Sequence, residues 1–227
     1  MKYRGKPGTR VICLLLGSGI AGAFAWQLAQ PPADKYIAAM DNPHRVLKVD
    51  EVIAKLELKP GMIVADIGSG SGSFSIPMAK AIAPNGILYA VDIDQAMLDH
   101  VAARAKEAGV SNVRTVLGEF DDPKLPVKNA DVAFFHRVLH MIEHRQAYLN
   151  ATARYLAPDG RVVVIEKNRE DSPDWMWLNQ PDVDSWMAAI GFYPAQHFGV
   201  FDDRYFVAYQ RPYGKSVLLK KGPAKKD

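Results

Sequence analysis

The chain has only one cysteine among its 227 residues, and this scarcity removes several classes of function. Cys13 lies in an apolar N-terminal segment, so no disulfide framework, cysteine-based zinc site or thiol catalysis is available to the rest of the chain. Internal repeats and low-complexity tracts are also lacking outside the termini. With 48% apolar and 23% charged residues, the composition is that of an ordinary globular protein, long enough for one α/β domain with a full core.

Acidic residues are almost lacking at both ends of the chain, so the positive charge of the ends offsets a negative net charge in the middle. Residues 1–33 hold four cations and no acid, and residues 211–227 hold six cations and one acid. Residues 34–210 hold 18 cations against 24 acids, a net charge of −6, although the whole chain carries +3. An acidic body is poorly suited to gripping phosphate backbones, so nucleic acid is not an expected partner.

The N-terminal 33 residues have the pattern of a targeting element. Basic residues up to Arg10 precede residues 11–29, which carry no charge, and Pro31-Pro32 then ends any helix. We predict a signal peptide or membrane anchor in residues 1–33, with membrane attachment through residues 11–29. An amphipathic or buried N-terminal helix is the alternative. The basic residues 213–227 are predicted to form a disordered tail.

A glycine-rich loop is the most informative motif of the chain. An apolar run ends in Asp66, and three glycines then alternate with serines, at Gly68, Gly70 and Gly72, ahead of a helical pattern. Such a loop joins a strand to a helix whose free N–H groups attract an anion. The dinucleotide fingerprint G-x-G-x-x-G/A would place its third glycine or alanine at Ser73, so this loop fails the NAD pattern at its last position.

Strand-like and helical patterns alternate along the middle of the chain, which predicts a parallel sheet. Strand-like runs occupy residues 62–66, 87–92, 113–117, 131–135 and 161–166. Helical patterns occupy residues 34–42, 46–56, 74–83, 95–108, 137–157 and 181–190. Two further β-type runs, at residues 195–200 and 205–210, flank Asp202-Asp203 and predict an antiparallel hairpin at the end of the sheet.

Taken in order, these motifs resemble those of the class I S-adenosylmethionine-dependent methyltransferases, and the overall pattern is most similar to the bacterial small-molecule type. The resemblance runs from about residue 42 to residue 212. It implies the class I methyltransferase fold over residues 34–212, an α/β, Rossmann-like, doubly wound and mostly parallel sheet of seven strands whose last hairpin is antiparallel. It also implies S-adenosylmethionine (S-adenosyl-L-methionine) as the cofactor.

The same resemblance assigns the cofactor-binding residues. Asp92 would accept from the ribose hydroxyls, Glu119 from the adenine amine, and Phe120 would contact the ring. Asp94 is expected to cap the next helix. Asp66 would face the amino group of the methionine moiety. The full predicted set is Asp66, Gly68, Ser69, Gly70, Gly72, Asp92, Ile93, Glu119, Phe120 and His136.

Three histidines follow the fourth strand-like run, at positions i, i+4 and i+8 of a predicted helix: His136, His140 and His144. Two of them could chelate an ion, but no third ligand is evident, so no metal site is expected. His136 lies at the carboxyl end of its strand, where ligands gather in open α/β sheets, and is the first candidate for a general base. His140 is the second candidate. Histidines that only pack or face solvent are the alternative.

We therefore expect transfer of a methyl group from S-adenosylmethionine to a small-molecule or lipid-like acceptor. The alternatives are a membrane-tethered S-adenosylmethionine-binding module without turnover and a nicotinamide-dependent oxidoreductase. The N-terminal segment predicts anchoring in the membrane or export to the cell envelope. Because the cofactor is made in the cytosol, the cytoplasmic face of the membrane remains open as a location.

Overall fold

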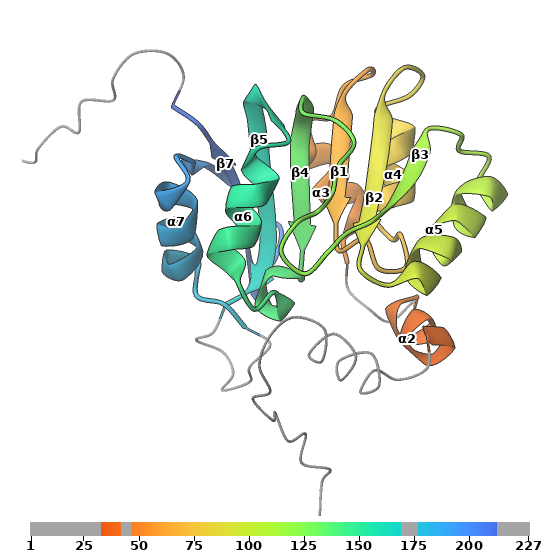
Figure 1. Ribbon diagram of the computed structural model, residues 1–227, viewed down its shortest axis with the longest axis horizontal. Helices are drawn as coiled ribbons and strands as arrows, with labels where there is room; N and C mark the ends of the chain where they lie inside the picture. The colour runs from red at the N-terminus through yellow and green to blue at the C-terminus, as the bar shows by residue number, and fades with distance from the viewer. Residues whose placement is uncertain (1–32, 42–46, 169–176, 213–227) are drawn as a thin grey trace, which may run out of the picture.

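A computed structural model of the chain describes residues 33–41, 47–168 and 177–212 and contains one seven-stranded sheet (Figure 1). The strand order is β3-β2-β1-β4-β5-β7-β6. The strands are β1 (Ile63–Ile67), β2 (Ile87–Asp92), β3 (Val113–Leu117), β4 (Ala130–His136), β5 (Leu156–Lys167), β6 (Tyr193–His197) and β7 (Arg204–Gln210). β1 to β5 pair in parallel, and β7 is antiparallel to both of its neighbours. The predicted fold class is confirmed.

Helices cover both faces of the sheet. They are α2 (Ala33–Met40), α3 (Val49–Leu56), α4 (Ser75–Ala81), α5 (Gln95–Glu107), α6 (Arg145–Ala153) and α7 (Gln180–Ala189), with a 3-10 turn, η1, at Leu139–Met141. Buried residues of α6 and α7 share one apolar cluster with one face of the sheet, and those of α3, α4 and α5 share a second cluster with the other face. The sheet is therefore doubly wound.

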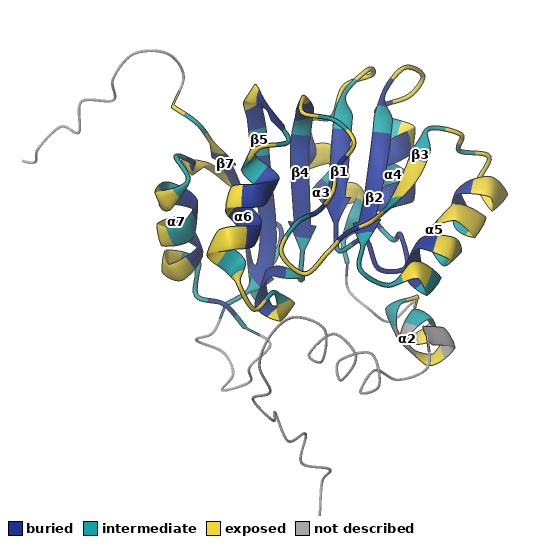
Figure 2. Cartoon of the chain, in the orientation of Figure 1, coloured by how far each residue is buried: buried dark blue, intermediate teal, exposed yellow. Residues whose placement is uncertain are grey.

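The central strands are buried on both faces, as Figure 2 shows for β1, β4 and β5. In β5, Val162 and Val164 belong to one cluster, and Val163 and Ile165 belong to the other. A run of β-branched residues without polar alternation suits a strand in this position, because successive side chains point to opposite faces and both are covered.

The predicted N-terminal element falls outside the described residues at positions 1–32, as does the predicted tail at 213–227. Among the helices of the described ranges, none combines the length and the apolar character that crossing a bilayer requires.

At the end of the sheet the predicted antiparallel hairpin is present, but the bounds of its first strand differ from the prediction. The run at residues 195–200 was expected to form a strand, but β6 lies at Tyr193–His197 and all five of its residues are exposed. Phe198 and Val200, which produced the apolar signal, follow the strand and bury their side chains in the core beside α3 and α4. The apolar pattern therefore marked a buried loop, whereas the edge strand itself has little apolar character.

The segment 137–157, predicted to be mostly helical, contains a shorter helix than expected. The chain leaves β4, forms η1, and is helical only over α6, while β5 already begins at Leu156. Residues 158–160, expected to be a turn, lie inside β5 at an irregularity in its pairing with β4. Gly160 is required at this point, because a Cβ there would lie 2.6 Å from the carbonyl oxygen of Ala130.

Replacing Gly160 with alanine should therefore destabilise the fold. We expect Gly160→Ala to lower the free energy of unfolding by about 1–3 kcal/mol, since backbone atoms must shift to admit the methyl group. Gly199→Ala is the matched control, because a Cβ there has no neighbour within 4 Å. Urea denaturation of both variants measures the difference, and equal stabilities would contradict this account of β5.

Candidate active site

The glycine loop lies between the carboxyl end of β1 and the start of α4, and it is packed from three sides. Gly68, Gly70 and Gly72 all have positive φ, at 68°, 52° and 79°. At Gly68 both the backbone angle and the close approach of a neighbour exclude a side chain. A Cβ at each glycine would lie close to a side chain from a different element: Val138 at Gly68, Met40 at Gly70, 2.7 Å away, and Val101 at Gly72, 3.1 Å away, with the approach closest at Gly68.

Asp92 lies directly beside this loop. It ends β2, and its Oδ2 accepts a hydrogen bond of 3.0 Å from the N–H of Gly70, while Oδ1 accepts from the N–H of Asp94 at 3.1 Å. Burial raises the pKa of Asp92, and these backbone donors oppose that rise. Asp94 caps α5 by accepting from the N–H of Ala96, as predicted. The fold thus places Asp92, the residue predicted to bind the ribose, in contact with the glycine loop.

Asp66 is buried beneath its neighbours. Its Oδ2 accepts a hydrogen bond of 2.5 Å from the hydroxyl of Ser75, the first residue of α4. Burial raises the pKa of Asp66 to about 7, the Ser75 hydroxyl lowers it, and the charge of Asp92 raises it further. A carboxyl group in this state is ready to become charged when a cation comes close to it.

Ser69 contributes an observation that fits a polar ligand. Its N–H donates to the carbonyl oxygen of Val91 at 2.9 Å, which fixes the loop on β2. Its hydroxyl is buried and has no hydrogen-bond partner in the described part of the chain. Buried polar atoms are almost always satisfied, so an unsatisfied one beside Gly68 and Gly70 indicates a place where a ligand group belongs. Ile93, which follows Asp92, is half-buried.

Glu119 and Phe120 follow β3 and lie at the surface. The carboxylate of Glu119 pairs with Lys124 at 3.1 Å, and its N–H donates to the carbonyl oxygen of Asp122. The Phe120 residue is 52% exposed, which is unusual for so large an apolar residue. The predicted contact of this ring with adenine stays a prediction.

The three histidines do not share a helical face, because the segment after β4 is a turn. His136 ends β4, and its ring centroid lies 4.6 Å from that of Phe74. His140 lies in η1 with only 5% of its surface exposed, while His144 is exposed ahead of α6. In the part of the chain that the structure describes, no group of three histidine, cysteine or acidic residues is placed to hold a metal ion.

The carboxylate of Glu166, which sequence reasoning missed, holds His140. Glu166, the last residue but one of β5, is fully buried, and its oxygens lie 3.0 and 3.2 Å from Nδ1 of His140. A signal for it existed, because Asp66 and Asp92 also lie in the last two positions of their strands. Three strands of this sheet carry an acid in their last two positions, and a role was predicted for only two of these acids, Asp66 and Asp92.

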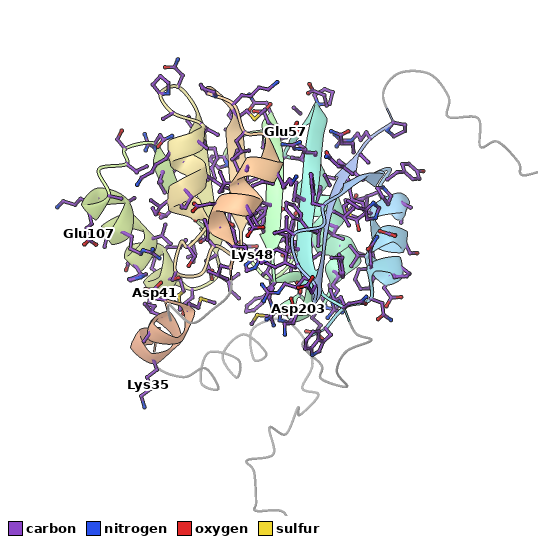
Figure 3. The ribbon with its side chains drawn as sticks, turned by 180° about the vertical axis from the view of Figure 1, so that it is seen from behind. Lys35, Asp41, Lys48, Glu57, Glu107 and Asp203 are labelled. Carbon is purple, nitrogen blue, oxygen red and sulfur yellow. The ribbon has the colours of Figure 1, made fainter. Side chains whose placement is uncertain are left out.

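A second missed group holds α2 against the loop. Asp41, labelled just after α2 in Figure 3, accepts from Arg104 of α5 at 3.1 Å and lies 2.9 Å from Nε2 of His100. Arg104 also donates to the carbonyl oxygen of Ser71 at 2.7 Å. Together with Met40 on Gly70, these contacts make α2 part of the wall around the loop.

Comparisons with known proteins agree with this arrangement. A model of the family described as a methyltransferase domain matches residues 58–197. Nocamycin O-methyltransferase of Saccharothrix syringae is 33% identical over 104 residues, which cover 46% of this chain and 37% of that protein. A ubiquinone/menaquinone biosynthesis C-methyltransferase of Burkholderia vietnamiensis is 33% identical over 132 residues, 57% of this chain and 53% of that protein.

The chain thus spans about half, or less, of the length of these curated relatives. Among solved structures, a SAM-dependent methyltransferase from Aquifex aeolicus superimposes with a TM-score of 0.70 at 22% identity, covering 79% of this chain and 98% of that one. Another, a SAM-dependent methyltransferase from Geobacter sulfurreducens in complex with S-adenosylhomocysteine, gives 0.59 at 22% identity and covers 74% of each chain. These structures share the fold.

The state of Asp66 gives a testable dependence of stability on pH. Because its folded pKa, about 7, lies above the ordinary aspartate value of 3.8, the native protein holds a proton between these two pH values that the unfolded chain releases. Stability from this group is therefore full below about pH 4 and is lost as pH rises to about 7. We expect Asp66→Asn to gain at least about 1 kcal/mol relative to wild type between these limits, measured by urea denaturation. Asp159→Asn, an exposed acid, should run parallel to wild type. Parallel curves for all three proteins would contradict a buried neutral Asp66.

Proposed function

The chain belongs to the methyltransferase domain family, and from this membership we propose that it transfers a methyl group from S-adenosylmethionine to a small-molecule acceptor. The observation that carries the proposal is the Asp92 carboxylate held 3.0 Å from the N–H of Gly70, at the carboxyl end of a parallel sheet. Ligands of open α/β sheets gather at this edge.

The residues present fit the cofactor. The buried and unsatisfied hydroxyl of Ser69 suits a polar ligand pressed against the loop. Asp92 would accept from the ribose hydroxyls, and the Asp66 carboxyl, with its raised pKa, would become charged beside the amino group. Glu119 and Phe120 would contact adenine.

When bound, S-adenosylmethionine supplies a methyl group already activated by its positive sulfur, so the protein has little acid–base work to do. Its main contribution is alignment of the acceptor, which the rigid ends of β4 and β5 can provide. His136 ends β4 at the same edge as the glycine loop and is our candidate to take the proton of an acceptor hydroxyl or amine. His140 is buried against Glu166 and is assigned no direct contact with the acceptor.

For the acceptor we propose a small molecule, with a lipid-like compound as the finer alternative. The curated relatives are named as methyltransferases of nocamycin and of ubiquinone or menaquinone biosynthesis. A lipid-like acceptor would also fit the pattern of residues 11–29, for which we propose membrane attachment with the catalytic body beside the bilayer.

The cofactor is tested by calorimetry on the full chain, titrated in parallel with S-adenosylmethionine, S-adenosylhomocysteine and NAD. We expect binding of the first two and an affinity at least about tenfold lower for Asp92→Asn, because a charged acceptor of hydrogen bonds is lost. Asp159→Asn removes the same charge from an exposed site and should bind as wild type does.

Two outcomes would replace this function. Binding of NAD alone would favour an oxidoreductase. Cofactor binding without release of S-adenosylhomocysteine in the presence of phenols, amines and quinone precursors would favour a binding module without turnover.

A further inference from the structure

Glu166 and His140 are both deeply buried, and they contact each other through more than one pair of atoms. Both carboxylate oxygens lie near Nδ1 of His140, and Oε1 also lies 3.4 Å from the backbone N–H of the same residue. Removing a carboxylate from water costs several kcal/mol, and apolar residues of similar size often stabilise a fold as well as a buried pair does. Stability alone is therefore a weak reason for this pair.

The turn that the pair holds has an unfavourable backbone. Arg137, directly after His136, has a φ of 54°, although it is not a glycine. Such a conformation costs about 1–3 kcal/mol and persists only where the surroundings enforce it. Here the N–H of Arg137 donates to the carbonyl oxygen of Ile165, and Arg145 donates to the carbonyl oxygens of Leu139 and His140, all at 2.8 Å.

This turn is also what closes the glycine loop on one side. Val138, two residues before His140, occupies the space in front of Gly68. A movement of the turn would therefore shift both Val138 and His136, which lies on the other side of the strained residue. The contact chain runs from Glu166 in β5 through His140 to Val138 and ends at the loop after β1.

We propose that Glu166 is a positioning residue, which through His140 holds the β4–α6 turn where Val138 closes the cofactor loop and His136 faces the acceptor. This inference rests on the proposed function, since it assigns Glu166 a part in cofactor binding. A positioning role differs from a purely structural role in one measurable respect. A Glu166 variant that still folds must bind S-adenosylhomocysteine, the product of the cofactor, less well than wild type does.

The experiment measures the affinity of the full chain for S-adenosylhomocysteine by calorimetry, with folding checked by circular dichroism and urea denaturation. We expect Glu166→Ala to weaken binding at least about tenfold, since the contacts of Glu166 with Nδ1 and the backbone N–H of His140 are lost. Glu166→Gln keeps the length and one acceptor oxygen and should restore part of the affinity. If the alanine variant does not fold, the glutamine variant tests the positioning role, and we expect it to bind about threefold more weakly than wild type. Glu143→Ala, an exposed acid after η1, is the matched control and should bind as wild type does.

Hydrogen exchange supplies a second readout, and we expect faster exchange in residues 137–145 of the Glu166 variants, with the strands unchanged. Folded Glu166 variants with wild-type affinity, whatever their stability, would overturn the positioning role and leave the proposed function intact. A wild-type chain that binds no S-adenosylhomocysteine would overturn both.

Discussion

The structure depends on three positions that have no side chain. Three separate elements meet at the loop after β1, and each packs one apolar side chain against a glycine of the loop. The positive φ values of the glycines allow the chain to turn there, and at Gly68 the close approach of Val138 also excludes a side chain. One loop thereby sets the spacing between the turn after β4, the first described helix and α5, at the edge of the sheet where ligands of open α/β sheets gather.

Three acids at strand ends illustrate how surroundings decide the chemistry of one group. Asp66 is buried with a single hydroxyl donor, so its pKa rises to about 7. Asp92 receives backbone donors that resist the effect of burial. Glu166 is fully buried and lies against an imidazole. The first is suited to respond to a nearby cation, the second to accept hydrogen bonds from a ligand, and the third to hold a neighbouring turn.

Local patterns predicted the elements that are determined locally. The loop at Gly68, the cap at Asp94 and the strand ending at Asp92 each follow from a few adjacent residues, and all three were found. The turn after β4 was predicted as a helix, because histidines spaced four residues apart occur both in helices and in tight turns. The two ion-pair groups were missed for a different reason: Glu166 is 26 residues from His140, and Arg104 is 63 residues from Asp41, so only the folded chain brings them together.

The place of β7 has a consequence for how the sheet is assembled during synthesis. β7 is the last described strand to leave the ribosome, yet it stands between β5 and β6. Until it arrives, the outer edge of β5 has no partner, and β6 has been made but has no strand to pair with. An unpaired edge rich in valine and isoleucine readily recruits other chains. Chains that end before residue 204 would therefore be more prone to aggregate than chains that include β7.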